Sequence, residues 1–381
     1  MLTEETVFSQ LSWVLQNKTT KMAVTHVGAH LAPVYFNLSD TSVVQPYYVS
    51  PWQSEDHAYL DGKSEGPLRG DFFCLPFGRA DPDDGTPAHG RTASALWTFS
   101  GFRILGRLQE LSIQMNNALH AACVDRKFFL RDGEDVIYDK TIITGLTGSY
   151  TFGHHAVLRV PAEDSALFVS TSKQKFSSTY PGNFCNPANA EYQSLAIGSE
   201  FSDLSSVPSI FKEYPNADCS RYPARRGFTD LLQIGIDPEM GQPAWSAAVN
   251  STEGYLWFSL RDPDLLPSTI LWIENGGRHQ QPWNGRNCSL GVEDVCSFFD
   301  TGSSVSSGMN AFSTRGIRTI QEFEAHLSLS IPYIQGVVRT PPGFTHVRSV
   351  HCDEHGATFA DEAGREVSSR LCANFVFGES L

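Results

Sequence analysis

Charged side chains are scarce in this sequence, and basic side chains are the scarcer kind. Asp, Glu, Lys and Arg make up 18% of the 381 residues, and 42 acidic against 28 basic residues give a formal net charge of −14 at pH 7. Nucleic acids and anionic membranes are both bound through basic faces. The composition therefore argues against nucleic acid and against a membrane as partners.

The sequence also lacks long apolar runs, a secretory signal and closely spaced cysteine pairs. Its first residues, MLTEETVFSQLSWVLQ, have no basic segment, apolar core or small-residue cleavage site. No apolar stretch approaches the length of a membrane span. The eight cysteines contain no Cys-x-x-Cys pair, which suits reduced thiols. We therefore expect a cytoplasmic protein, of an oligomeric state that the sequence leaves open.

Motifs for metals and nucleotides are equally scarce. There is no phosphate-cradling glycine loop of the P-loop or dinucleotide type. The run His351-Cys-Asp-Glu-His355 contains residues that bind metals, but no second pair of ligands accompanies it. The adjacent His154 and His155 cannot both face one ion from a regular strand. The sequence therefore predicts neither a metal nor a cofactor.

Convincing helical periodicity occurs only near the N-terminus. Between Glu4 and Gln16, apolar residues recur at a spacing that places them on one side of a helix. These residues are Val7, Leu11, Val14 and Leu15. The pattern predicts a helical N-terminal extension over residues 1–20.

The rest of the chain is typical of strands and turns. Short segments rich in β-branched and aromatic residues alternate with Gly, Pro, Asn or Asp, in keeping with 31 Gly and 21 Pro. The predicted strands include residues 21–27, 96–106, 136–144, 155–160, 255–260, 269–273, 344–351 and 365–377. The pattern predicts one mainly β domain over residues 1–381, a sandwich of two large antiparallel sheets with little helix. Residues 181–227 are expected to form long loops over one face.

The first segment that could carry chemistry contains His89. The runs Arg69-Gly-Asp-Phe-Phe-Cys-Leu-Pro-Phe-Gly78 and Thr86-Pro-Ala-His-Gly90 lead through a Pro-rich loop towards a strand. A His-Gly pair at such a place can present an imidazole at the rim of a sheet, where backbone approaches a ligand closely. An ordinary loop histidine is the alternative.

The second segment is Gly153-His-His-Ala-Val-Leu-Arg-Val160. Adjacent residues of a strand face opposite sides, so only one of its two histidines can reach a given pocket. We assign His155 to the pocket. The alternative is that both histidines are satisfied by backbone carbonyls.

The third segment, Leu271 to Val295, is dense in polar, aromatic and glycine residues. The run Cys288-Ser-Leu-Gly-Val-Glu is typical of a buried strand that ends on Glu293, and a buried carboxylate must be paired or functional. Glu293 is therefore a candidate base. Glu274 ends a similar strand, and an ion pair with Arg278 is its alternative role.

Taken together, the three segments resemble the galactose mutarotase-like superfamily, and the first is similar to its hexose-6-phosphate epimerase branch. That branch has an Arg-Gly-Gly-Ile-Pro strand, a Pro-Phe-Gly element and a Pro-x-His-Gly signature, matched here by Arg69-Gly70, Pro76-Phe-Gly78 and Pro87-Ala-His-Gly90. His155-Ala-Val-Leu stands where the family has a His-x-Tyr-Phe strand. Val292-Glu293 stands where the family strand delivers its catalytic glutamate.

This resemblance runs over most of residues 20–300 and keeps the family order. It implies a galactose mutarotase-like β-supersandwich that binds a small-molecule carbohydrate. It further implies an aldose 1-epimerase-like enzyme, which interconverts sugar anomers by opening and reclosing the ring with acid and base catalysis. In this interpretation Glu293 is the base, His155 is the acid, and His89 binds near the ring oxygen.

The same resemblance suggests how the sugar is held. Arg69 and Arg91 are expected to bind hydroxyls or a phosphate, and Trp283 is expected to stack on the sugar or to be a buried aromatic. The arginine that follows the family's His-Gly-Phe-Ala is absent at that offset, which favours a neutral sugar. The family's binding aspartate has no clear counterpart, since Asp230 and Asp262 both fit poorly. A non-catalytic carbohydrate-binding protein and another carbohydrate-processing reaction stay open as alternatives.

Overall fold

Strands dominate the computed structural model, which describes residues 1–39, 41–56, 58–79 and 85–381. Within these residues the one α-helix is α1, the single turn Ser303–Ser306. The 3-10 helices are Pro51–Ser54, Ala58–Leu60, Arg91–Ala93, Pro187–Asn189, Leu204–Ser206, Ser313–Arg315 and Ala373–Phe377. The prediction of a mainly β protein with little helix is confirmed.

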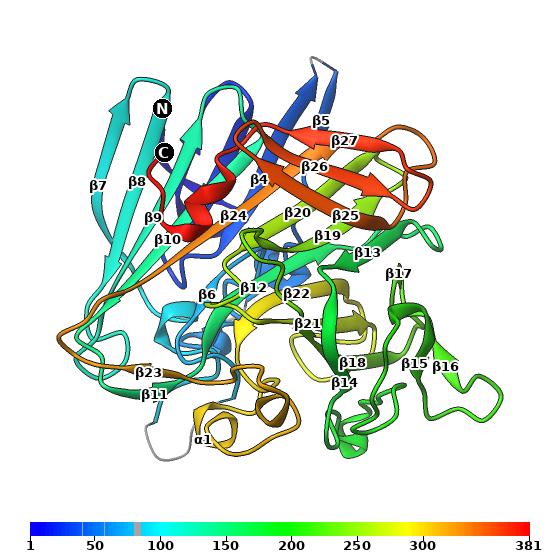
Figure 1. The fold of residues 1–381 in the computed structure, drawn as a ribbon. Helices are drawn as coiled ribbons and strands as arrows, with labels where there is room; N and C mark the ends of the chain where they lie inside the picture. The colour runs from blue at the N-terminus through cyan, green and yellow to red at the C-terminus, as the bar shows by residue number, and fades with distance from the viewer. Residues whose placement is uncertain (40, 57, 80–84) are drawn as a thin grey trace.

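Two large antiparallel sheets form the body of the molecule (Figure 1). The nine-stranded sheet has the order β17 (Arg221–Tyr222), β13 (Leu167–Thr171), β19 (Ala244–Asn250), β20 (Tyr255–Arg261), β24 (Leu329–Arg339), β10 (Val136–Thr144), β9 (Cys123–Arg131), β8 (Leu108–Met115) and β7 (Thr98–Leu105). The six-stranded sheet has the order β14 (Gln174–Thr179), β18 (Phe228–Ile236), β21 (Ser268–Asn275), β22 (Cys288–Cys296), β12 (Phe152–Arg159) and β6 (Phe73–Cys74). One apolar core, which includes Leu232 and Leu271 of the smaller sheet and Trp257 of the larger, joins them.

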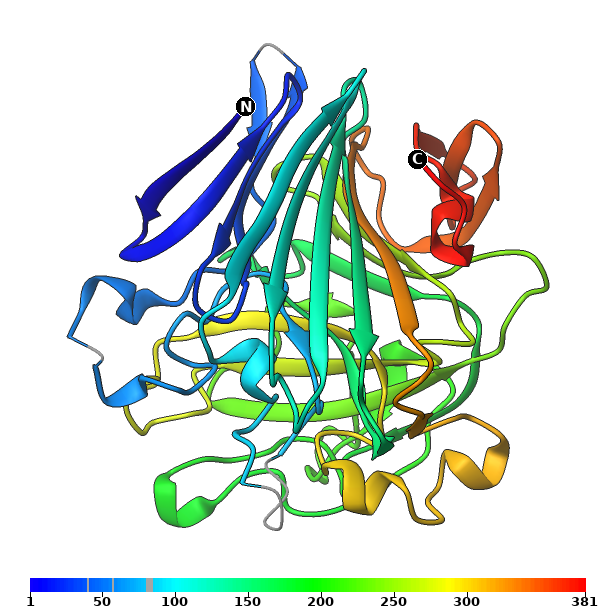
Figure 2. The same ribbon diagram turned by 90° about the vertical axis from the view of Figure 1, so that its left-hand side faces the viewer.

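The N-terminal segment forms strands, so the predicted helix over residues 1–20 is wrong. It is part of a five-stranded sheet of β1 (Leu2–Val7), β2 (Gln10–Gln16), β3 (Thr20–Thr25), β4 (Leu31–Ser39) and β5 (Ser42–Val44), seen at the left of Figure 2. β1 and β2 form a hairpin whose turn residues Phe8 and Ser9 have φ of 45° and 66°. Neither residue is a usual turn former in this conformation, so the hairpin could not be predicted from the sequence.

Smaller sheets cover the ends and outer faces. β25 (Val347–Asp353), β26 (Gly356–Asp361) and β27 (Glu366–Ser369) form a three-stranded sheet. It packs on the nine-stranded sheet through contacts such as that of Phe359 with Phe258. The predicted strand over residues 365–377 is correct only at its start, because the chain turns into a 3-10 helix that buries Phe375 and Val376.

The long segment from residue 181 to 227 has little regular structure, as predicted. It contains β15 (Val207–Pro208) paired with β16 (Asn216–Ala217) and ends in β17. A further two-stranded sheet joins β11 (Gly148–Tyr150) to β23 (Gln321–Phe323). These segments lie around the lower end of the molecule as drawn in Figure 1.

A buried ionic cluster connects the two large sheets. Arg126 of β9 donates to Asp139 of β10 at 2.6 Å and to Asp71 at 2.9 Å, and His154 Nδ1 of β12 lies 3.0 Å from the same Asp71 oxygen. All four side chains are at most 1% exposed. Ligand atoms of the two aspartates and the histidine lie within 4.8 Å of one another, but the guanidinium already binds both carboxylates. The cluster is therefore a buried ion-pair network, in which Arg126 takes the place that a metal ion would need.

We expect Arg126→Met to lower the free energy of unfolding by about 3–5 kcal/mol, because it leaves two buried carboxylates without a cation. Arg159→Met is the matched control, since Arg159 forms an exposed pair with Glu253 and its loss should cost about 1 kcal/mol or less. Urea unfolding followed by tryptophan fluorescence measures both. An equal cost for the two variants would contradict the assigned role of the cluster.

Candidate active site

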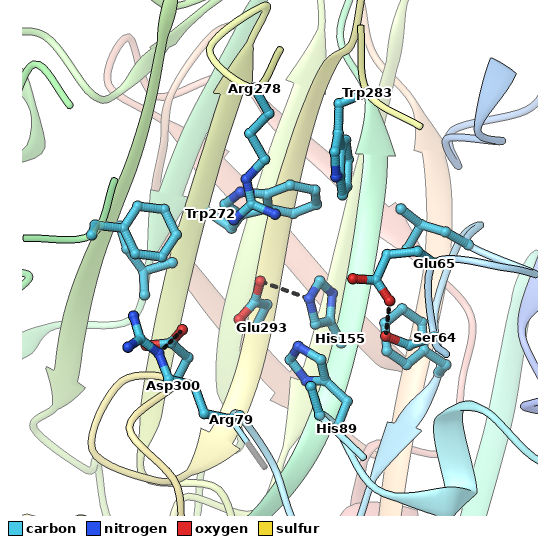
Figure 3. Close-up of a pocket in the computed structure, with 16 residues that line it drawn as sticks. Ser64, Glu65, Arg79, His89, His155, Trp272, Arg278, Trp283, Glu293 and Asp300 are labelled. Atoms are coloured by element: carbon cyan, nitrogen blue, oxygen red, sulfur yellow. Dashed lines mark hydrogen bonds and ion pairs between the residues drawn. The ribbon is translucent and has the colours of Figure 1, made fainter. Parts of the chain in front are cut away.

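The pocket lies on the face of the six-stranded sheet that points away from the nine-stranded sheet. Residues of β18, β21 and β22 alternate, so that Leu232, Leu271 and Val292 enter the core between the sheets while their neighbours face the pocket. The cavity has a volume of about 190 Å³. Its lining residues are Ser64, Glu65, Leu68, Phe72, Gly78, Arg79, Ala88, His89, His155, Phe184, Leu231, Trp272, Arg278, Trp283, Glu293 and Asp300. Figure 3 shows how their side chains converge.

His155 and Glu293 form a buried pair at the centre of this pocket. They occupy opposed positions in the antiparallel ladder of β12 and β22. His155 Nε2 lies 3.1 Å from Glu293 Oε1, and the two residues are 6% and 3% exposed (Figure 3). The strand continues to Cys296, so Glu293 lies inside β22 and not at its end as the sequence suggested. His154, the neighbour of His155 in β12, faces the opposite side of the sheet, as the alternation of a strand requires.

Burial sets the protonation of the pair. Desolvation raises the pKa of Glu293 well above its ordinary value, and the charge of nearby Asp300 raises it further. Desolvation lowers the pKa of His155 well below its ordinary value, with a further lowering by His89. Both directions favour the uncharged forms. Burial therefore disfavours the form of the pair in which Glu293 is a carboxylate and His155 an imidazolium.

The ring of His155 is oriented by stacking. Phe72 lies between two histidines, with ring centroids 4.5 Å from His155 and 4.1 Å from His30, and both pairs are close to parallel. His155 Nδ1 is buried and has no hydrogen-bond partner among the described residues. Many histidines are fixed by a hydrogen bond at the second nitrogen. Here the Phe72 face and the Nε2 contact hold the imidazole instead.

His89 reaches the pocket from a loop. Its φ is 62°, in the left-handed region, and its ring lies 5.0 Å from that of His155 at 79°. Gly90 is required by the chain itself, since a Cβ there would lie 1.9 Å from the carbonyl oxygen of Leu75. His89 Nδ1 is 3.5 Å from Cys74 Sγ, and burial lowers the pKa of His89. The three histidine and glutamate positions predicted from sequence thus meet in one cavity.

An aromatic wall closes the pocket on another side. Trp283, a predicted lining residue, stands at 81° to Trp272, with ring centroids 5.6 Å apart. The guanidinium of Arg278 lies over both indoles, 5.3 Å from Trp272 and 5.0 Å from Trp283, and 5.6 Å from Phe184. The predicted ion pair of Arg278 with Glu274 is long, at 3.9 Å. Arg278 was expected only as that partner, and its place in the pocket was not predicted from the sequence.

Arg69 does not lie on the pocket wall, contrary to the prediction. It is fully buried, and it donates to the carbonyl oxygens of Val7 and Phe8 and to the side chain of Gln53. The turn of the N-terminal hairpin offers these carbonyls, and an unpaired buried guanidinium is costly, so the side chain turns away from the cavity. Arg69 therefore holds the hairpin.

Arg91 is also outside the pocket. The chain turns back directly after Gly90 into a 3-10 helix, which leaves the Arg91 side chain exposed. Arg79, which was not predicted from the sequence, lines the cavity and pairs with Asp300 at 3.3 Å. Arg79 directly follows the Pro-Phe-Gly element, which was the signal that could have found it.

Neither Asp230 nor Asp262 supplies a carboxylate to the cavity. The Asp230 carboxylate points to the other side of β18, where it accepts hydrogen bonds from Ser194 and Leu195, and Leu231 faces the pocket in its place. Carboxylates come instead from Glu65 and Asp300. Asp230 and Asp262 are not among the residues that line the cavity.

Comparison by sequence found no match, whereas comparison by structure found many. No model of a known protein family matches the sequence, and no curated protein matches it. None of the helices in the described part of the chain has the length and apolar character needed to span a membrane.

Several solved structures share the architecture at low sequence identity. A galactose mutarotase-like protein of Clostridium acetobutylicum is 13% identical, with a TM-score of 0.59 over 89% of this chain and 99% of its own. A candidate mutarotase of Salmonella typhimurium is 12% identical, with a TM-score of 0.58 over 89% of this chain and 94% of its own. A candidate aldose 1-epimerase of Escherichia coli K12 is 11% identical, with a TM-score of 0.55 over 89% and 100%. The chain therefore has the galactose mutarotase-like fold.

Proposed function

We propose that the protein is an aldose 1-epimerase-like enzyme that interconverts the anomers of a sugar. The observation that carries this proposal is the buried contact of His155 with Glu293 at 3.1 Å in a cavity of about 190 Å³, which suits a monosaccharide better than a polymer. An acid and a base of this kind are what ring opening requires. The fold shared with a galactose mutarotase-like protein supports a carbohydrate as the ligand.

The pair can move both protons of the reaction. Ring opening removes a proton from the anomeric hydroxyl O1 and adds one to the ring oxygen O5. Glu293, as carboxylate, accepts the O1 proton while the His155 imidazolium gives its proton to O5. The C1–O5 bond breaks as the C1–O1 bond becomes a carbonyl. Rotation about C1–C2 and reversal of these steps close the ring on the other face.

Proton conservation makes the buried site suitable for this cycle. Before ring opening the pair is carboxylate and imidazolium, and afterwards it is carboxylic acid and neutral imidazole. Both states hold one proton, so no proton has to enter from solvent. Burial of the pair favours the second state. In the free enzyme the proton must therefore pass from Glu293 to His155 before the sugar ring is opened.

The surrounding side chains suit the other contacts of a sugar. His89 stands beside His155 and can donate to the ring-oxygen region. Trp272 lines the cavity and offers apolar contact to a sugar ring. Trp283 offers an indole for the apolar face of the ring. The alternative, a carbohydrate-binding protein without turnover, is favoured by the displacement of Arg69 and Arg91 from the cavity.

We expect Glu293→Gln to reduce anomer interconversion about 10²- to 10⁴-fold while sugar binding changes little, because the amide keeps the size but removes the base. His155→Asn should act similarly by removing the acid. Exchange NMR on a panel of aldoses measures the rates and calorimetry the binding. Glu253→Gln, an exposed glutamate far from the ladder position of Glu293, is the control. Wild-type turnover in Glu293→Gln would exclude Glu293 as the base, and binding without turnover in the wild type would favour the binding protein.

We expect the rate to pass through a plateau and to fall on its acid and its alkaline side. A raised pKa lets Glu293 keep the shared proton to higher pH, and a lowered pKa keeps His155 from taking a second proton until lower pH. The acid limb should therefore lie below the ordinary histidine value of 6.5, and the alkaline limb well above the ordinary glutamate value of 4.5. Polarimetry at constant ionic strength, corrected for buffer catalysis, gives the profile. An acid limb above pH 6.5 would contradict this account of the pair.

A further inference from the structure

Two lining residues in the described part of the cavity carry a permanent positive charge, and they differ in how that charge is used. Arg79 is exposed, and its Nε pairs with Asp300 at 3.3 Å. Arg278 has only a quarter of its side chain exposed, and its Nε is 3.9 Å from the nearest oxygen of Glu274, too far for a hydrogen bond. Arg79 therefore forms a hydrogen-bonded pair with a carboxylate, whereas the in-plane N–H donors of Arg278 are available.

The surroundings of Arg278 hold the guanidinium at the pocket without satisfying it. Trp272 and Trp283 present their faces to it at 5.3 and 5.0 Å, which desolvates and orients the cation but accepts no hydrogen bond. One oxygen of Glu274 is occupied by the backbone N–H groups of Gly277 and Arg278. Figure 3 shows the guanidinium of Arg278 beside Trp272, in the same pocket as the His155–Glu293 pair.

The charge of the other walls limits which anion the site can take. Glu65 and Asp300 both line the cavity, and Asp300 is compensated by Arg79. A phosphate dianion would meet one available guanidinium and the opposing Glu65 carboxylate. A carboxylate has a single charge and two coplanar oxygens, which match the fork of one arginine.

Resting on the proposed function, and in place of the neutral sugar that the sequence favoured, we infer that the substrate is a sugar carboxylate, a uronate, whose carboxylate is bound by Arg278. The connectivity of a uronate fits the placement of the residues. Its carboxylate is attached to C5, which is bonded to O5, one of the two atoms that His155 and Glu293 must reach. With O5 at the pair, the C5 substituent is directed to the wall of the pocket, where the guanidinium of Arg278 has a carboxylate at 3.9 Å but no hydrogen bond to it.

The test compares sugars that differ only at C6. Anomer exchange of hexose, uronate and hexose 6-phosphate is measured by NMR in the gluco, galacto and manno series, with enzyme-free blanks. We expect kcat/KM for one uronate to exceed kcat/KM for its parent hexose by about tenfold or more. It should also exceed kcat/KM for the corresponding 6-phosphate. Arg278→Gln should lower the uronate-to-hexose ratio about tenfold or more, while Arg278→Lys keeps part of it as a point charge. Arg91→Gln, outside the pocket, should keep the wild-type ratio.

The outcomes separate this inference from the proposed function. Equal rates for hexose and uronate, a preference for the 6-phosphate, or an unchanged ratio in Arg278→Gln would each overturn the carboxylate assignment while leaving the epimerase proposal in place. If no sugar is turned over, the proposed function fails, and calorimetry then decides the ligand. Uronate binding that Arg278→Gln weakens about tenfold supports the inference, and absence of uronate binding overturns it.

Discussion

The pairing of β12 with β22 is the constraint on which the site depends. In its register His155 stands opposite Glu293, and His154 stands opposite Asp294. A slip of the register by one residue would turn every side chain of one strand to the other face. Both the acid–base contact and the ionic core behind it would then be lost together. The geometry of the site is therefore a property of the sheet, and no loop closure is needed to assemble its two central groups.

The inner face of the same two strands explains why this register is stable. Asp294 is fully buried and accepts hydrogen bonds from Ser259, Thr269 and Tyr333, at 2.6 to 2.8 Å. His154 is tied to Asp71 and stacks on Tyr333, with ring centroids 3.9 Å apart. Buried polar groups are costly unless each finds its partner, so these bonds penalise any other alignment. Polar contacts between the sheets thus position the outward-facing pair.

Local pattern and family resemblance together predicted the two central residues from sequence. Alternation showed that only one of His154 and His155 can face a given pocket, the cost of burying a carboxylate singled out Glu293, and both His155 and Glu293 line the cavity. It could not place Arg69, because the carbonyls that hold that side chain belong to the turn at Phe8, 61 residues away. The same turn, built from two residues with positive φ and no glycine, concealed the N-terminal strands. Local pattern fixes which face a side chain takes, but not which distant partner it meets there.

Arginine positions diverge more easily than the central pair for a physical reason. A long side chain can reach the same volume from several loops, whereas His155 and Glu293 must keep one ladder register. Here Arg79 and Arg278 enter the cavity from loops on either side. Of the two arginines expected there, Arg69 binds the N-terminal hairpin and Arg91 is exposed to solvent. The proposed proton-transfer groups His155 and Glu293 belong to the rigid sheet, whereas the arginines of the cavity belong to its connections. A fold of this kind can therefore keep its chemistry while the charge of its ligand changes, since substitutions in the loops leave the β12–β22 ladder untouched.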